Sequence, residues 1–124
     1  MKKKGIKLII DTEGNGEELQ KGNYYYISTR IWLSKGDPVI WTKPHGVLDR
    51  MVLSEDKTKL TADYRFDREH LIAGLFYGLE GMRVGGKRTI EVAPHLAYKE
   101  EGVPGMIPSN ALLIIEIEVL EKRE

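Results

Sequence analysis

The chain has 124 residues, of which 41% are hydrophobic and 31% charged, and 19 Lys and Arg balance 19 Asp and Glu. This size and composition predict one soluble globular domain that is large enough to bury a core. The zero formal charge argues against a nucleic-acid partner, because such a protein needs a basic surface to neutralise phosphates. The absence of cysteine excludes disulfides, thiolate catalysis and thiolate metal ligands.

Two further patterns concern membranes and metals. No segment has transmembrane length, and the apolar stretch Ile6–Ile10 contains Lys7 and is too short for a signal-peptide core. We therefore expect no membrane partner and a cytoplasmic location, although an exported protein without its signal peptide would look the same. His45, His70 and His95 stand far apart without metal-ligand spacing. They are interpreted as surface or capping histidines, and no metal is expected.

The first half of the chain predicts strands that are separated by turns. Ile6–Ile10 is the first strand and Asp11–Gly16 the turn that follows it. Asn23–Leu33 alternates over a longer strand, and Thr61–Phe66 alternates again. The predicted core face of the long strand carries Tyr25, Ile27, Thr29, Ile31 and Leu33.

The segment from Val39 to Leu60 has the least regular pattern, and we expect an enlarged loop or hairpin there. Val47–Leu53 fits a short strand or one arm of that hairpin. One interpretation is a flap able to hold unfolded chains through its apolar side chains. The other, which we favour, is a structural hairpin that packs the same side chains on the sheet. These residues are Val47, Leu48, Met51, Val52 and Leu53.

One convincing helix follows Asp67, whose carboxylate suits a helix N-cap, and Gly81 suits its C-cap. The apolar residues at helical spacing are Leu71, Ile72, Leu75, Phe76 and Leu79. Gly74 and Gly78 would each destabilise the helix by about 1 kcal/mol relative to alanine. Their presence in so short a helix predicts close packing against a sheet.

Two more strands, Lys87–Val92 and Ala111–Glu121, complete the chain. In the last strand, odd-numbered apolar residues face the core and Glu116 and Glu118 face water. The order of elements predicts an α+β domain, in which one short helix packs across an antiparallel sheet.

The loop over Ala97–Pro108 precedes the last strand and carries features of a peptide-binding groove. Two prolines hold it open, and Gly102 and Gly105 let it bend. Tyr98 offers a hydroxyl donor, while Met106 and Ile107 offer an apolar surface and main-chain N–H groups. This combination favours a shallow apolar groove that grips a peptide.

The second half of the chain resembles the FKBP family, the macrolide-binding peptidyl-prolyl cis-trans isomerases. The matching stretches are LIxG at 71–74, GLEGMRVG at 78–85, KRTIEVAP at 87–94, LAY at 96–98, GVPGMIP at 102–108 and ALL at 111–113. The first half matches more loosely, at Asp11, Gly14 and Gly16. The resemblance implies a single domain over residues 1–124, with a curved antiparallel β-sheet wrapped around one short α-helix. It also implies a groove for an X-Pro bond and no metal or organic cofactor.

The resemblance further implies individual roles. The Tyr98 hydroxyl and the Ile107 main-chain N–H would hold substrate carbonyl groups. The implied substrate-binding residues are Thr29, Val39, Leu71, Ile72, Leu75, Val103, Met106 and Ile115. Periodicity alone interprets Leu71, Ile72, Leu75 and Ile115 as core, and Tyr98 also fits a buried tyrosine with a satisfied hydroxyl.

Several family aromatics are replaced. Leu75 stands at the position of a pocket-floor tryptophan, Thr29 at that of a tyrosine, and Val39 and Ile40 at a phenylalanine–aspartate pair. The changes predict a wider pocket with fewer aromatics and no buried carboxylate, and hence weak macrolide binding and weak isomerase activity. Trp41 could swing in to replace a missing ring.

The sequence therefore predicts a peptidyl-prolyl isomerase that acts on proline-containing peptides or unfolded proteins. The alternative is a catalytically inactive FKBP-like module that binds a peptide or a partner protein.

Overall fold

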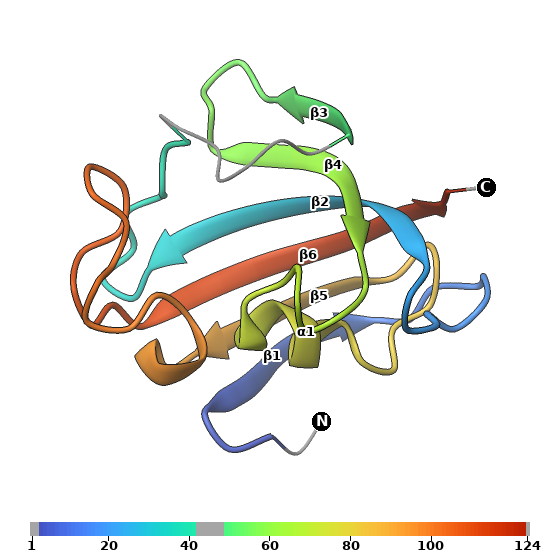
Figure 1. Cartoon of the computed structure of the whole chain (residues 1–124), viewed down its shortest axis with the longest axis horizontal. Coiled ribbons are helices and arrows are strands. Elements are labelled where there is room, and N and C mark those ends of the chain that lie inside the picture. The colour runs from blue at the N-terminus through green and yellow to red at the C-terminus, as the bar shows by residue number, and fades with distance from the viewer. Residues whose placement is uncertain (1–2, 42–48, 124) are drawn as a thin grey trace.

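A computed structural model describes residues 3–41 and 49–123, which form strands, one α-helix and a single 3₁₀ turn (Figure 1). The strands are β1 (Ile6–Thr12), β2 (Tyr24–Leu33), β3 (Asp49–Leu53), β4 (Lys59–Arg65), β5 (Lys87–Val92) and β6 (Leu113–Lys122). The helix α1 covers Ala73–Leu79, and the 3₁₀ turn covers Pro94–Leu96.

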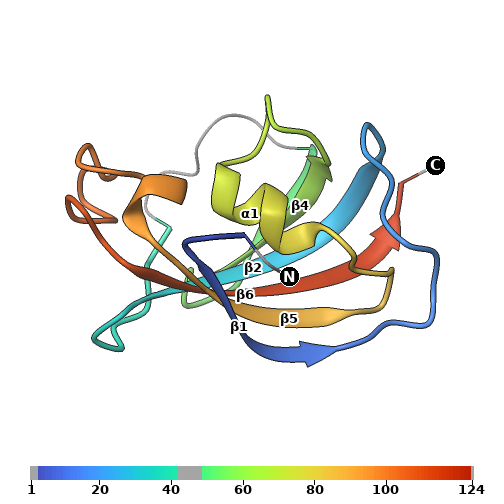
Figure 2. The same ribbon diagram turned by 90° about the horizontal axis from the view of Figure 1, so that it is seen from below.

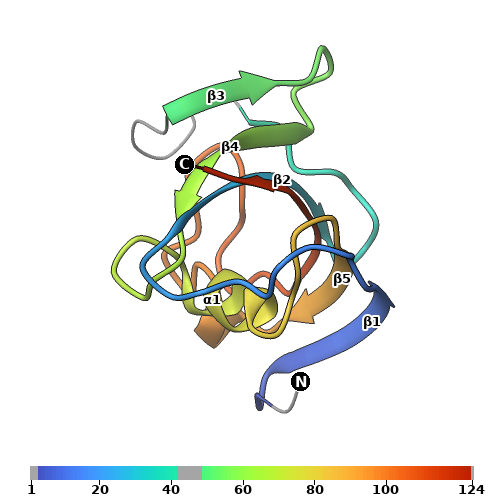
Figure 3. The ribbon, with the colours of Figure 1, turned by 90° about the vertical axis from the view of Figure 1, so that its right-hand side faces the viewer.

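All the strands belong to one sheet, in the order β1-β5-β6-β2-β4-β3, and every neighbouring pair is antiparallel. The sheet curves, and α1 lies against one of its faces (Figures 2 and 3). This arrangement confirms the predicted α+β fold with a curved sheet around one short helix. The concave face of the sheet and the helix together enclose the core.

The burial of alternate side chains confirms the two long strands predicted from the sequence. Tyr25, Ile27, Thr29 and Ile31 in β2 are buried, while Leu33 is half-buried at the end of the strand. In β6 the buried residues are Leu113, Ile115, Ile117 and Val119. Because side chains alternate across a strand, β2 and β6 line the inside of the curve with these residues.

The helix begins later than predicted. Its N-cap is Ile72, which makes no side-chain capping bond, so the predicted N-cap role of Asp67 is wrong. The Asp67 carboxylate instead accepts hydrogen bonds from the N–H groups of Glu69 and His70, at 3.1 and 2.9 Å. It closes a separate turn, because a short Asp side chain satisfies nearby donors in a turn as well as in a helix.

Gly74 and Gly78 bring α1 close to the sheet, as predicted. A Cβ atom on Gly74 would lie 2.4 Å from Val92 Cγ1, and one on Gly78 would lie 2.5 Å from Ile90 Cδ1. At the far end of the helix, the C-cap is Glu80, and Gly81 follows it with φ +81°. The left-handed conformation at that position explains why a glycine ends the helix.

The Val39–Leu60 segment contains β3, which pairs with β4 at the edge of the sheet. Met51 and Val52 are exposed, whereas Leu53 packs partly against the core. Val47 and Leu48 lie outside the described residues. The described part is thus a paired hairpin with an exposed apolar edge, which combines features of both interpretations.

Candidate functional site

An apolar cavity of about 300 Å³ lies between α1 and the concave face of the sheet. Its walls come from β2, β4, β6, the loop that leads into α1, and Tyr98, which lies just after the 3₁₀ turn. The lining residues are Thr29, Ile31, Trp41, Leu60, Tyr64, His70, Leu71, Ile72, Leu75, Tyr98 and Ile115. This described lining contains no carboxylate.

Many of the residues predicted for the site meet in this cavity. They are Thr29, Leu71, Ile72, Leu75, Tyr98 and Ile115. Val39 is buried in the core and does not line the cavity. Val103, Met106 and Ile107 border a separate, shallow concavity on the loop before β6. The structure therefore divides the predicted site between two places.

The predicted main-chain donor of Ile107 is engaged inside its own loop. Its N–H donates to the Val103 carbonyl at 2.8 Å, and the Val103 N–H donates back to the Ile107 carbonyl at 2.8 Å. Gly102 and Gly105, with φ of +60° and +79°, allow the tight bend that this bridge requires. The Ile107 N–H could hold a substrate carbonyl only after the bridge had opened.

Ile72 supplies a main-chain donor at the cavity itself. Its carbonyl accepts the first hydrogen bond of α1, from the Phe76 N–H at 3.0 Å. Its own N–H has no acceptor among the described residues, as is usual for the start of a helix. Because Ile72 lines the cavity, this N–H is placed to bind a carbonyl group there.

Two tyrosines provide neutral hydroxyl groups in the cavity. Burial raises the pKa of Tyr64 to about 12, against a smaller lowering by the hydrogen bond with Thr29. Burial also raises the pKa of Tyr98. Both phenols therefore keep their protons at neutral pH and remain hydrogen-bond donors.

The comparisons with known proteins bear directly on this arrangement. The family model of the FKBP-type peptidyl-prolyl cis-trans isomerases matches residues 35–120, which include most of the cavity. The chain belongs to this family. The match covers α1, β5, most of β6 and the loop before β6, where the resemblance was already apparent from the sequence.

Relatives of this FKBP-type domain are longer proteins. The 39 kDa FK506-binding nuclear protein of Drosophila melanogaster is 30% identical over 119 residues, which cover 93% of this chain and 29% of that protein. FK506-binding protein 4 of Aspergillus fumigatus is 37% identical over 73 residues, which cover 59% and 15%. Human peptidyl-prolyl cis-trans isomerase FKBP9 is 47% identical over 51 residues, which cover 41% and 9%. The chain thus spans less than a third of the length of each.

A solved structure supports the fold. The crystal structure of a peptidyl-prolyl cis-trans isomerase from Pseudomonas syringae pv. tomato superimposes with a TM-score of 0.66 at 18% identity. The similarity covers 96% of this chain and 74% of that one. The FKBP-type domain described here therefore shares its overall architecture with that isomerase.

Trp41 stands in the cavity wall of this FKBP-type domain. The side chain is buried, with 6% of its surface exposed. Its ring thus supplies an aromatic wall to the cavity that Leu75 also lines. The indole Nε1 is buried and has no hydrogen-bond partner in the described part of the chain.

Other lining residues were not predicted from the sequence. Leu60 and Tyr64 come from β4, and Ile31 continues the core face of β2 beyond Thr29. The pairing of Thr29 with Leu60 in the sheet brings these strands together. His70 is exposed, as its interpretation as a surface residue requires, and it also lines the cavity.

Within residues 3–41 and 49–123, no group of three or more His, Asp and Glu side chains is placed to hold a metal ion. In the same residues, no helix is long and apolar enough to cross a membrane.

Proposed function

We propose that this domain catalyses cis-trans isomerisation of X-Pro bonds in peptides or unfolded proteins. The observation that carries the proposal is the apolar cavity between α1 and the sheet, which holds neutral hydrogen-bond donors and no described carboxylate. Family membership and the printed names of the relatives support the same activity.

An apolar cavity suits this reaction for a physical reason. Rotation about the peptide bond breaks amide resonance and crosses a barrier of about 20 kcal/mol. The twisted amide has lost resonance and part of its carbonyl dipole, whereas the planar amide is polar and well solvated by water. Removing water therefore costs the planar form more and lowers the barrier. Each tenfold acceleration requires about 1.4 kcal/mol of preference for the twisted form.

The described residues divide the work between packing and hydrogen bonding. Leu71, Leu75 and Ile115 provide apolar surface for a proline ring. The Tyr98 hydroxyl and the Ile72 N–H would hold the carbonyl groups of the peptide while the ring turns. No nucleophile or general base is needed, because no covalent bond forms or breaks.

The test compares rates of cis-trans exchange of a proline tetrapeptide with wild-type and variant domains. Ile72→Pro removes the N–H donor at a residue whose φ of −61° already suits proline. Ile72→Ala is the matched control, since it shortens the side chain and keeps the N–H. A larger loss of kcat/KM in Ile72→Pro than in Ile72→Ala supports the assigned role. A wild-type domain that leaves the uncatalysed rate unchanged would overturn the proposed activity.

The alternative is a module that binds proline peptides without catalysis. The Ile107 N–H favours this binding module, because that expected donor is hydrogen-bonded to the Val103 carbonyl within its own loop. This alternative predicts saturable peptide binding at the cavity with no acceleration of exchange, so the same samples separate the two functions.

Further proposals concern ligands and context. We propose weak macrolide binding, because the cavity floor carries Leu75 and Thr29 where the family has aromatics; isothermal titration with FK506 tests it. A role in protein folding is proposed from the activity and from the exposed Met51 and Val52 of β3. We also propose that the protein is located in the cytoplasm.

A further inference from the structure

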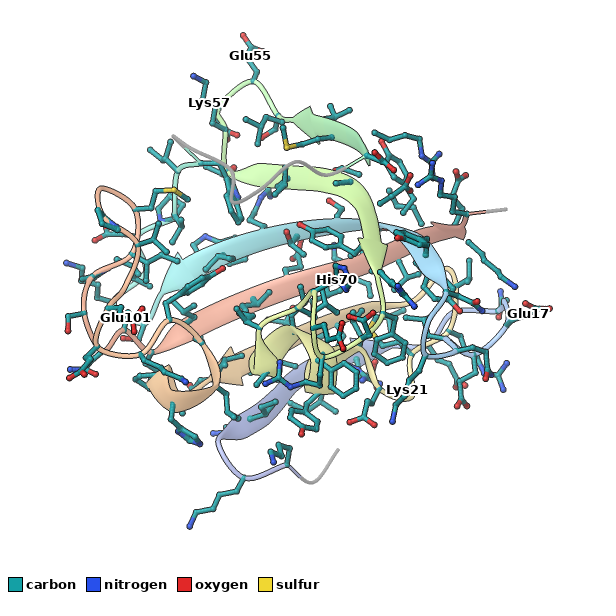
Figure 4. All side chains as sticks on the ribbon, viewed as in Figure 1. Glu17, Lys21, Glu55, Lys57, His70 and Glu101 are labelled. Carbon is teal, nitrogen blue, oxygen red and sulfur yellow. The ribbon has the colours of Figure 1, made fainter. Side chains whose placement is uncertain are left out.

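His70 occupies an unusual place for a half-exposed polar residue. It lies on the loop between β4 and α1, in front of the sheet (Figure 4), and contributes to the lining of the cavity. Its side chain keeps 52% of its surface exposed. His70 therefore borders the cavity and is open to the solvent from which a peptide enters.

The ring is held in one orientation by Asp67. His70 Nδ1 lies 2.7 Å from Asp67 Oδ1, and the Arg65 Nε lies 3.0 Å from Asp67 Oδ2. Although burial acts in the opposite direction, hydrogen bonds from the His70 ring and its main-chain N–H hold the pKa of Asp67 below its usual value. An ionised carboxylate only accepts hydrogen bonds, so Nδ1 carries the proton and Nε2 is left for another partner. No described residue is hydrogen-bonded to Nε2.

His70 also determines the charge of the cavity wall. The other described lining residues are apolar or hydroxyl-bearing, and the two phenols among them keep their protons at neutral pH. The loop around His70 carries the cations Arg65 and Arg68 and the anions Asp67 and Glu69, which balance. Arg68 is turned toward the Leu71 carbonyl, to which it donates at 2.8 Å. Protonation of His70 thus leaves this loop with one net positive charge.

We propose that His70 selects X-Pro substrates in which a residue flanking the proline carries a carboxylate, and that this selection strengthens as the imidazole becomes protonated. The proposal rests on the proposed isomerase function of the same cavity. The charged imidazole donates from Nε2 to the substrate carboxylate at the cavity entrance, while Asp67 keeps the ring in place. His70 acts as a specificity residue and takes no part in the bond rotation itself.

The experiment uses tetrapeptides that differ only in Glu, Gln or Lys, placed before or after the proline. Cis-trans exchange rates are measured by NMR at about pH 8 and about pH 6, a range over which imidazoles change charge and glutamate stays ionised. For the wild-type domain, we expect the ratio of kcat/KM for Glu over Gln peptides to rise about fivefold at the lower pH, at one of the two positions. The Lys peptides should be disfavoured under the same conditions.

Variants separate His70 from the rest of the chain. His70→Gln should remove the dependence of the ratio on pH, and His70→Lys should keep the preference for Glu at both pH values. His95→Gln is the matched control, because His95 is exposed and lies outside the cavity; it should behave as wild type. Equal rates for Glu and Gln peptides in the wild type, or a preference that survives in His70→Gln, would overturn the proposal.

Failure of the isomerase function is distinguishable from failure of this inference. A domain that accelerates none of the peptides lacks the activity, and the same peptides are then compared by their affinities in an NMR titration. Tighter binding of the Glu peptide at about pH 6, lost in His70→Gln, supports the selection by His70; equal affinities overturn it.

Discussion

The contact between α1 and β5 gives a sharp prediction for Gly74→Ala. The new Cβ would lie 2.4 Å from Val92 Cγ1 and 3.0 Å from the Leu96 carbonyl oxygen. Carbon atoms pack best at about 3.5–4.0 Å, so the helix must retreat by about 1 Å. Val92 is fully buried, and the carbonyl belongs to the backbone, so neither neighbour gives way easily. Overpacking of this kind costs about 1–3 kcal/mol, while alanine gains at most about 1 kcal/mol of helix propensity.

We therefore expect Gly74→Ala to lower the free energy of unfolding by up to about 2 kcal/mol in urea titrations. Because Leu75 lines the cavity, the shift of the helix should also lower kcat/KM for proline peptides. Ala73→Gly is a comparison variant without crowding: it removes a Cβ atom from the same turn and should cost about 1 kcal/mol of helix propensity, together with the packing of Ala73 against the core. A Gly74→Ala domain more stable than wild type would refute the reasoning, since propensity alone would then decide the outcome.

Three further predictions test other parts of the structure. Tyr98→Phe should lower kcat/KM by up to about tenfold, measured by NMR exchange, since one hydrogen bond contributes about 0.5–1.5 kcal/mol; an unchanged value contradicts the role of the hydroxyl. Asp63→Asn should lower the free energy of unfolding by about 1–3 kcal/mol, because the fully buried carboxylate pairs with Arg50 at 2.6 Å; a loss below about 0.5 kcal/mol in urea titrations contradicts this. Burial raises the pKa of Tyr64 to about 12, so the folded state favours the neutral phenol. The contribution of the neutral phenol to the free energy of unfolding is complete below about pH 10 and is lost as the pH rises through 12. Between these pH values, the free energy of unfolding from urea titrations should fall less steeply in Tyr64→Phe than in wild type. Equal falls in the two proteins would contradict the predicted direction of the pH dependence.

The fold was predictable because a strand that buries one face alternates core-facing and outward-facing residues along the sequence. Alternation in β2 and β6 marks which side chains face the core, and the glycines of α1 indicate a close approach to the sheet. The start of the helix was predicted wrongly because Asp67 makes the same short-range hydrogen bonds in a turn as at an N-cap. Sequence alone does not separate these two uses of one carboxylate.

The candidate site was predictable only in part, for a different reason. Tyr98 and Leu71 lie within the family motifs and Leu75 directly follows one, so the resemblance located them. Leu60 and Tyr64 reach the cavity through the pairing of β4 with β2, which no local pattern records. The bridge that engages the Ile107 N–H depends on the conformation of its loop, which spacing of prolines and glycines does not specify.

The central claim is that the cavity between α1 and the sheet accelerates rotation of a prolyl bond. The most direct measurement records exchange between the cis and trans forms of a proline peptide together with the amide and indole NMR signals of the labelled domain. We predict that exchange accelerates in proportion to the amount of domain, and that the signals of Ile72 and the Trp41 indole shift as the peptide saturates. Exchange at the uncatalysed rate, or shifts confined to residues 103–108 while Ile72 and Trp41 remain unchanged, would contradict it.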